Sequence, residues 1–307
     1  MKLIKQNVEL LNQYEGLKGI FKQIELAGRV CYNSENKITE DSAEDFVNQL
    51  IASNHLSVLE HGTVYLTIPI SEWNSEEDVN QCIYAVNPYS KINDYDVDYL
   101  NRTGNVYITT NYRVIVENNL YNDLQFLTEP RIAHHKRYTI RCTTDIGVSR
   151  EFNRHRKLSI SERSTRYCNF SKDKFNNEIT FILPQWVDDH YLTEYNNLNV
   201  GELNPGMLND LVLSTDDNVQ IWIESLVEVE KYYLSLINGG WIAQKARQVL
   251  PLNTATIVVY TGYEEDWKHF FDLRLKGTSG APHPNMKELA ALILDEFNKN
   301  NINFYKR

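Results

Sequence analysis

The chain has 307 residues and a formal net charge of −10, with 41 acidic against 31 basic residues. Hydrophobic residues make up 42% of it and charged residues 23%, which is typical of a globular protein with a sizeable core. The acidic balance argues against binding to a long nucleic acid, because proteins that do so usually carry a basic face. It still permits a small anionic ligand held by a local basic pocket.

Cysteine usage and hydropathy indicate the compartment. The four cysteines form no C-x-x-C pair and are too sparse for a disulfide scaffold. The N-terminal segment lacks the apolar run and small-residue cleavage site of a secretory signal. No window approaches the roughly 18 uninterrupted apolar residues of a membrane span. We therefore expect a cytoplasmic protein that makes no contact with a membrane.

The first clear elements occur before residue 71. A helix is predicted over 39–53, with Thr39 as its N-cap and acids in its first turn. Its apolar face is formed by Phe46, Leu50 and Ile51. A polar loop at 54–62 leads to a strand over 63–70, where apolar side chains alternate with more polar ones. Residues 71–135 show no regular spacing of apolar residues. Within them, the segment 111–127 is compatible with a helix or with a strand.

The second half of the chain has stronger patterns. Strands are predicted over 137–144, 178–184 and 254–262. Helices are predicted from near Val148, and over 216–239, 241–251, 264–275 and 285–300. The last helix places Met286, Ala290, Ile293 and Phe297 on one stripe. Strands and helices mix without regular βαβ alternation, so the expected fold class is α+β.

One dense basic segment, RHRKLSISERSTRY, runs from Arg154 to Tyr167. It holds four arginines, a lysine and a histidine, with serine and threonine hydroxyls between them. Arginine offers a planar fork of donors that matches phosphate oxygens in two-point contacts. We interpret the segment as a candidate phosphate site. Arg247 and Arg274 are further candidates, although each taken alone is more simply interpreted as a surface charge.

Other interpretations of these residues stay open at this point. If the basic segment is helical, Glu162 and Arg166 share a face, and the cluster could be a solvated helix with internal ion pairs. His55, Glu60 and His61 could bind zinc, although their spacing is not a strong metal pattern. No G-x-G-x-x-G and no G-x-x-x-x-G-K-[ST] occurs, so neither a Rossmann fold nor a P-loop is predicted.

Three separated segments together resemble the flavin-dependent thymidylate synthases. The basic segment is similar to the family pattern R-H-R-x-x-S-x-N-E-x-S-x-R-Y and departs from it at Ser161, where the family often has Asn. HLSVLEH resembles the upstream H-x-[ST]-x-x-E-H segment, and ARQVLPLNTAT and DWKHFFDLR resemble the C-terminal segments. The similarity covers about residues 20–70 and 136–300. Residues 71–135 depart from compact members, so we expect one catalytic domain over 1–307 with an insertion there.

The resemblance implies a mixed sheet with helices and the reductive methylation of dUMP to dTMP. Methylenetetrahydrofolate would supply the one-carbon group, and NADPH would supply the reducing electrons through bound FAD. A homotetramer with active sites shared between subunits is also implied, and no metal is expected. In this family no protein nucleophile is thought to attack the pyrimidine, so Ser164 is expected to bind rather than react.

Site residues are carried over position by position. Arg274 is the expected catalytic residue, because a fixed guanidinium beside the pyrimidine stabilises negative charge as the ring loses its N–H proton. Glu151 stands where some members have Gln, and His269 stands at an Asn-type position. The dUMP site would comprise Glu151, Arg154, Glu162, Arg163, Ser164, Arg166, Arg247 and Arg274. The FAD site would comprise Ser57, Arg154, His155, Arg156, Glu162 and His269.

Two rival functions are weighed against this synthase. A metal-dependent nucleotide hydrolase that uses His55, Glu60 and His61 predicts a bound transition metal and no flavin absorbance. A noncatalytic nucleotide-binding protein predicts dUMP binding without NADPH oxidation.

Overall fold

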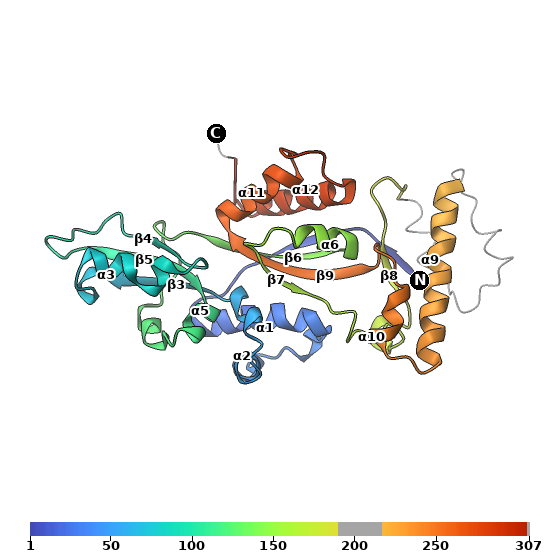
Figure 1. The fold of residues 1–307 in the computed structure, drawn as a ribbon, viewed down its shortest axis with the longest axis horizontal. Helices are drawn as coiled ribbons and strands as arrows, with labels where there is room; N and C mark the ends of the chain where they lie inside the picture. Colours follow the sequence, from blue (N-terminus) through green and yellow to red (C-terminus); the bar gives the residue numbers. More distant parts are fainter. Residues whose placement is uncertain (190–216, 306–307) are drawn as a thin grey trace.

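The computed structural model describes residues 1–189 and 217–305 and is built on a four-stranded antiparallel sheet (Figure 1). β6 and β9 form its centre and pair over their full lengths, from Arg137 opposite Tyr263 to Asp145 opposite Ala255. The short β7 lies at the edge beside β9. In sheet order the strands are β2 (Asn7–Leu11), β6 (Arg137–Asp145), β9 (Ala255–Tyr263) and β7 (Ser159–Glu162).

Helices cover both faces of this sheet because its strands alternate apolar side chains between the two sides. Val258 and Tyr260 of β9 pack toward the helices drawn above the sheet in Figure 1, and Val259 packs toward α1 (Gly16–Tyr32) below it. The helices above the sheet are α6 (Ile146–Phe152), α11 (Glu264–Arg274) and α12 (Pro284–Lys299). Their shared core is aromatic, and it fixes the position of α11 over the sheet.

A second, three-stranded sheet forms a lobe beside the first (Figure 1). β5 (Asn105–Asn111) lies in its middle, between β3 (Thr63–Pro69) and β4 (Lys91–Asn93). This lobe has its own apolar core, which extends to α1. Around it lie α2 (Ser42–Ala52), α3 (Glu76–Gln81), α4 (Ile83–Val86), α5 (Tyr112–Glu117), and the 3₁₀ helices η2 (Leu56–His61), η3 (Ile70–Glu72) and η4 (Tyr121–Phe126). The 3₁₀ helix η1 (Glu35–Lys37) follows α1, and its Glu35 pairs with Arg141 of β6.

A third packing unit lies at the opposite end of the molecule. β1 (Lys2–Ile4) pairs in parallel with β8 (Thr180–Ile182), and both pack against the long helix α9 (Asp217–Asn238). The remaining elements here are η5 (Asp173–Phe175), α10 (Ala243–Ala246) and η7 (Arg247–Val249). None of the helices in the described parts of the chain is long and apolar enough to cross a membrane.

Several sequence predictions are confirmed by this architecture. The fold is α+β, with several sheets and helices. The four residues of the predicted stripe on α12 are all fully buried. The long helix α9 ends where Gly239 and Gly240 follow it, and Gly240 takes a positive φ of 92° that suits glycine. The strand predictions over 63–70, 137–144 and 254–262 correspond to β3, β6 and β9.

One open interpretation is excluded, and two local predictions are wrong. The basic segment is not helical, because Ser159–Glu162 form β7 and the residues that follow it form a turn. Glu162 and Arg166 therefore do not share a helix face. Helix α2 begins at Ser42 with Asp41 as its N-cap, and the Ser42 hydroxyl accepts a bond from the Thr39 amide at 2.9 Å. The helix predicted over 241–251 is a single turn, α10, followed by η7.

Candidate active site

The R-H-R residues lie in the tight turn that joins α6 to β7. Asp145 starts α6 by accepting a hydrogen bond from the Val148 amide at 2.6 Å, and the helix ends at Phe152. The His155 amide then bonds to the Phe152 carbonyl at 2.9 Å, and the Leu158 amide bonds to the His155 carbonyl at 3.0 Å. Phe152 and Leu158 are buried, so they anchor both ends of the turn. The arginines and lysine between them stay at the surface.

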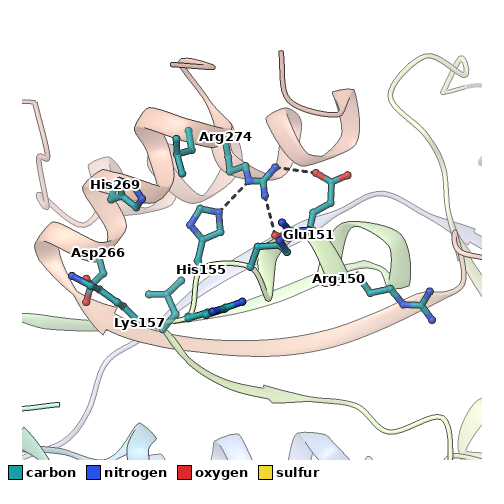
Figure 2. A pocket seen from close by; sticks show the side chains of 11 residues that line it. Arg150, Glu151, His155, Lys157, Asp266, His269 and Arg274 are labelled. Atoms are coloured by element: carbon teal, nitrogen blue, oxygen red, sulfur yellow. Dashed lines mark hydrogen bonds and ion pairs between the residues drawn. The ribbon is translucent and has the colours of Figure 1, made fainter. Parts of the chain in front are cut away.

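A cavity of about 780 Å³, here called the first cavity, lies between this turn and α11 (Figure 2). Four arginines and a lysine face only two carboxylates in its lining, so it is positive although the chain is acidic. Such a lining attracts anionic groups. Its lining residues are Arg150, Glu151, Arg154, His155, Arg156, Lys157, Leu158, Asp266, His269, Leu273 and Arg274.

Arg274, the last residue of α11, is held by three hydrogen bonds to α6 and the turn. Its Nε donates to His155 Nε2 at 3.0 Å, and its Nη1 donates to the Glu151 carboxylate at 3.1 Å. Its Nη2 donates to the Glu151 main-chain carbonyl at 3.1 Å. Figure 2 shows the guanidinium fixed between these partners. A guanidinium has five N–H groups, so these contacts leave two for a ligand.

His155 is the neutral acceptor in this arrangement. Because its Nε2 accepts from Arg274, the ring proton belongs on Nδ1. Burial and the neighbouring Arg274 charge lower the pKa of His155 to about 4. The ring packs against Phe152 and Phe270, with centroid distances of 6.0 and 5.1 Å. An uncharged, tightly packed acceptor therefore orients Arg274 at neutral pH.

The wall of the first cavity opposite the turn is one face of α11. Asp266, His269 and Leu273 follow each other at spacings of three and four residues, which places them on the same side of the helix. The Asp266 carboxylate accepts a bond from the Tyr263 amide at 3.3 Å and so caps the first turn. His269 is exposed, and its ring centroid lies 6.3 Å from that of His155.

A second cavity, of about 560 Å³, lies on the other side of the basic segment, against η7. Arg150 lines both cavities. Three arginines face one carboxylate here, so this lining is also positive. The lining residues are Ile146, Ser149, Arg150, Glu162, Arg163, Ser164, Thr165, Arg247, Gln248, Leu250, Pro251 and Leu252.

The arginines of the second cavity lack carboxylate partners in the described parts of the chain. Arg247 donates from Nη1 to the Thr165 hydroxyl at 3.2 Å. The buried Nε of Arg163 has no hydrogen-bond partner among the described residues. The carboxylate of Glu162 instead accepts from the Ser149 hydroxyl at 2.8 Å, and burial raises the pKa of Glu162. These guanidinium groups therefore keep most of their donors for a ligand.

The expected site residues divide between the two cavities. Ser57 and Arg166 line neither of them and are exposed, and the Arg166 guanidinium lies 5.5 Å from the Tyr167 ring centroid. The first cavity brings together Glu151, Arg154, His155, Arg156, His269 and Arg274. The second brings together Glu162, Arg163, Ser164 and Arg247. The ligand assigned to each residue stays a prediction.

The residues of the zinc alternative do not converge. His55 is exposed, and Glu60 forms an ion pair with Arg113 at 2.7 Å. His61 is buried, and neighbouring hydroxyls bond to both of its ring nitrogens. Within residues 1–189 and 217–305 no group of three His, Cys, Asp or Glu side chains could hold a metal ion. The geometry therefore gives the hydrolase alternative no support.

Three charged lining residues were missed by the sequence reasoning. Arg150 belongs to both cavities, yet it precedes the R-H-R segment, and no local pattern marks it. Lys157 lies inside the basic segment but matches no fixed position of the family pattern. Asp266 could have been found, because it lies three residues before His269 on a predicted helix and must share its face.

The thymidylate synthase complementing protein family matches residues 10–91 and 110–300. The chain belongs to this family. This family comprises the flavin-dependent thymidylate synthases, so the family predicted from the sequence is confirmed. The predicted enzyme class, a methyltransferase, is confirmed as well. Of the expected insertion at 71–135, only residues 92–109 lie outside the match.

Solved structures give more distant matches. The UMP/dUMP methylase PolB from Streptomyces cacaoi, bound with 5-Br UMP, is 17% identical at a TM-score of 0.43. That match covers 97% of this chain and 92% of the methylase. Thymidylate synthase ThyX from Helicobacter pylori, with FAD and dUMP, is 13% identical at a TM-score of 0.39 and coverages of 97% and 95%. Among curated proteins, none matches the chain.

Proposed function

We propose that this member of the thymidylate synthase complementing protein family methylates dUMP reductively to dTMP. Methylenetetrahydrofolate is the one-carbon donor and NADPH the reductant. The observation that carries the proposal is Arg274, which lies in a cationic cavity with its guanidinium fixed by His155 and Glu151. The family match supports it, since this family has the same activity.

The donor set of the first cavity fits FAD. Arg154, Arg156 and Lys157 present exposed cationic groups in one turn, which is the chemistry that a pyrophosphate requires. His155 and His269 add ring surfaces beside them. When bound, FAD supplies the redox chemistry that links NADPH oxidation to reduction of the transferred carbon. The chain's own residues bind and orient the reactants.

Arg274 acts on the pyrimidine of dUMP. Its two remaining N–H groups are donors for a ring oxygen, and its charge stabilises the anion that forms when the ring loses its N–H proton. The three protein contacts hold the guanidinium in place before the substrate arrives. No reorganisation is then needed as negative charge develops. Glu151 contributes by holding Arg274, in addition to its proposed place in the dUMP site.

The second cavity binds the dUMP phosphate. Arg163 and Arg247 offer uncommitted donors, and the Ser164 hydroxyl lies beside them. A phosphate dianion placed there would pair with charges that the protein itself leaves unpaired in the described residues. Charge-assisted bonds of this kind stabilise a complex by roughly 1.5–3 kcal/mol each.

The active enzyme is a homotetramer in which two subunits build each site. The split of the dUMP residues between two cavities supports this, as does Arg166, which lines neither of them in its own chain. We place the protein in the cytoplasm, because its four cysteines are too sparse for a disulfide scaffold and form no C-x-x-C pair.

Subunit sharing is tested by mixing Arg274→Ala with Arg247→Ala under conditions that exchange subunits, and assaying at a low dUMP concentration at which both variants have little activity. If each site takes Arg274 from one copy and Arg247 from another, some mixed sites contain both arginines and activity returns. If each chain builds its own site, every site keeps one lesion and the mixture is no more active than the two unmixed variants. Size-exclusion chromatography with light scattering reports the oligomeric state of both variants.

The function itself is tested first by an absorption spectrum of the purified protein. FAD is added, the protein is desalted, and NADPH is then added anaerobically with and without dUMP. Flavin bands that stay with the protein and bleach with NADPH support the synthase, and a methyl-transfer assay follows. A colourless protein that retains no FAD would contradict it. Binding of dUMP without NADPH oxidation would favour the noncatalytic nucleotide-binding alternative.

A further inference from the structure

A buried histidine connects the two motifs on which the site is built. His61 is the last residue of η2, the 3₁₀ helix that carries Ser57, and its exposed fraction is 0%. Its Nε2 lies 3.0 Å from the Ser161 hydroxyl of β7, and its Nδ1 lies 2.8 Å from the Thr261 hydroxyl of β9. One imidazole therefore joins η2 to two strands of the main sheet.

His61 is uncharged in its contacts with Ser161 and Thr261. Burial and the nearby Arg137 charge lower its pKa to about 3, so one ring nitrogen donates and the other accepts. The Thr261 hydroxyl also bonds with the Thr139 hydroxyl of β6 at 2.8 Å. Both nitrogens are thus satisfied inside the protein, which excludes a direct role in binding a ligand or an ion.

Ser161 transmits this contact to the second cavity. It directly precedes Glu162, the first of the basic-segment residues in that cavity. The next two residues are fixed by their amides: Arg163 bonds to the Ile257 carbonyl at 2.8 Å, and Ser164 bonds to the Cys31 carbonyl at 2.9 Å. In residues 159–162 the side chains of Ser159 and Ser161 are buried on the sheet face that meets η2. A change at Ser161 therefore acts on the whole segment 161–164.

Arg137 reinforces the same junction from β6. Its guanidinium donates to the Glu60 carbonyl and the Thr63 hydroxyl, both at 3.2 Å, and to the Ser159 hydroxyl at 3.4 Å. These partners lie at the end of η2, the start of β3 and the start of β7. All are neutral, so this cation serves as a multiple donor and not as half of an ion pair. The junction of η2 with β7 is therefore polar, buried and specific in its geometry.

We propose that His61 is a positioning residue that fixes segment 161–164 for the nucleotide phosphate by holding the Ser161 hydroxyl. An apolar residue at position 61 would remove the His61 partner of the buried Ser161 hydroxyl, while Thr261 would keep its bond with Thr139, and β7 would lose its direct contact with η2. The arginine and hydroxyl donors of the second cavity would then sample several arrangements. The inference rests on the proposed function, because the proposed function assigns the dUMP phosphate to the second cavity.

The test compares His61→Leu with His134→Leu in the full-length protein. His134 is a matched control, because it is also buried and uses both ring nitrogens, with the Arg131 amide at 2.9 Å and the Leu66 carbonyl at 2.9 Å. Hydrogen exchange is measured at the Arg163 and Ser164 amides, and the Kd for dUMP is measured by calorimetry. His61→Leu should accelerate exchange at both amides and raise the Kd about tenfold, equivalent to about 1.4 kcal/mol. His134→Leu should change neither.

Two further variants separate positioning from general stability. Ser161→Ala should reproduce the rise in Kd, and adding it to His61→Leu should give little further loss, because both changes break one contact. His61→Gln, which keeps a donor and an acceptor, should recover part of the affinity. It also serves as the test protein if His61→Leu does not fold. Turnover at saturating dUMP should stay within about twofold in His61→Gln, because Arg274 is untouched.

The two proposals fail in different ways. If the wild-type protein does not bind dUMP, the proposed function fails, while the exchange experiment still decides whether His61 fixes the segment. If wild type binds dUMP but folded His61→Leu keeps its Kd, or keeps slow exchange at Arg163 and Ser164, the role of His61 is overturned. Strictly additive losses in the double variant would overturn it as well.

Discussion

The first and second cavities both present arginines to a ligand, but they prepare those arginines differently. In the first, Arg274 already makes three hydrogen bonds, to His155 and to both the side chain and main chain of Glu151. In the second, Arg247 has a single hydroxyl partner in the described residues, and Arg163 keeps an unpartnered Nε. One region fixes a guanidinium before a ligand binds, and the other leaves guanidinium groups uncommitted.

This difference suits two different tasks. A charge that must stabilise a transient anion should be in position in advance, because reorganisation during the reaction adds to the barrier. Charges that bind a permanent dianion gain most when the protein itself does not neutralise them. We therefore assign charge development to the first cavity and ground-state phosphate binding to the second. The predictions below separate turnover from affinity on this basis.

The largest effect is expected for Arg274→Ala. It should lower turnover by about 100-fold or more, because one fixed charge-stabilising donor is lost, while FAD stays bound. Steady-state kinetics and the flavin spectrum measure both properties. Lys268→Ala, at an exposed position on the same helix outside the cavity, is the control and should behave as wild type. An Arg274→Ala enzyme of near wild-type rate would remove the assigned role.

A smaller effect, on affinity, is expected for Arg247→Ala. Loss of one charge-assisted contact to the phosphate should raise the Kd for dUMP roughly 10- to 100-fold. Turnover at saturating dUMP should change much less, and calorimetry with initial-rate kinetics distinguishes the two. Lys245→Ala, an exposed change on the adjacent α10, provides the control.

Arg166→Ala should likewise weaken dUMP binding, and an unchanged Kd would contradict the site assigned to Arg166.

Acidification should act through the histidines whose pKa is lowered, including the partly buried His155 in the first cavity. The pKa of His155 is about 4 in the folded protein and near 6.5 when unfolded, so the unfolded chain binds more protons between these values. The free energy of unfolding should fall as the pH drops from about 6.5 toward 4, and His61 adds to the same trend. Denaturant titrations at pH 7.5 and 5 measure it.

A matched variant isolates the contribution of His155. His155→Asn removes the titrating group, so the loss of stability between pH 7.5 and 5 should be smaller than in wild type. A protonated His155 also cannot accept from Arg274, so wild-type turnover should decline only at lower pH, as the pH approaches the folded-state pKa of about 4. An identical pH dependence of stability in both proteins would show that His155 does not bury a neutral ring.

The smallest effect is expected for Glu151→Gln. Glutamine retains an acceptor for Arg274, and the main-chain carbonyl that accepts from Nη2 is unchanged. The ion pair is partly exposed, with 36% of the Glu151 side chain accessible, so it contributes at most about 1 kcal/mol. Turnover should fall by less than about tenfold. A loss as large as that of Arg274→Ala would mean that the carboxylate itself takes part in the reaction.

Sequence patterns predicted the regular elements well where a regular spacing of apolar residues continued over several turns or along a whole strand. The stripe on α12 and the apolar alternation in β3 arise because one face of each packs into an apolar core, and that constraint is visible in the sequence. The basic segment was harder, because β7 spans only Ser159–Glu162 and two of its inward side chains are serines. A short strand that buries hydroxyl groups shows no alternation of apolar and polar residues by which it could be recognised in the sequence.

The division of the site was also invisible in the sequence. Arg154 and Arg163 are close in the chain, yet β7 separates the cavities that they line. Conversely, Glu151 and Arg274 are far apart in the chain but in contact, because α6 and α11 pack on the same sheet face. Residue types identified the chemistry, whereas only tertiary packing could pair each arginine with its partner.

The segment 92–109, which the family match does not cover, limits how the enzyme could be shortened. It includes most of β5, the middle strand of the lobe, whose Thr109 carbonyl accepts a bond from the Tyr263 hydroxyl at 2.7 Å. Tyr263 immediately precedes α11, so this contact ties the lobe to the helix that carries Arg274. A minimised enzyme should therefore keep β5 and replace only the connection at 94–104 between β4 and β5.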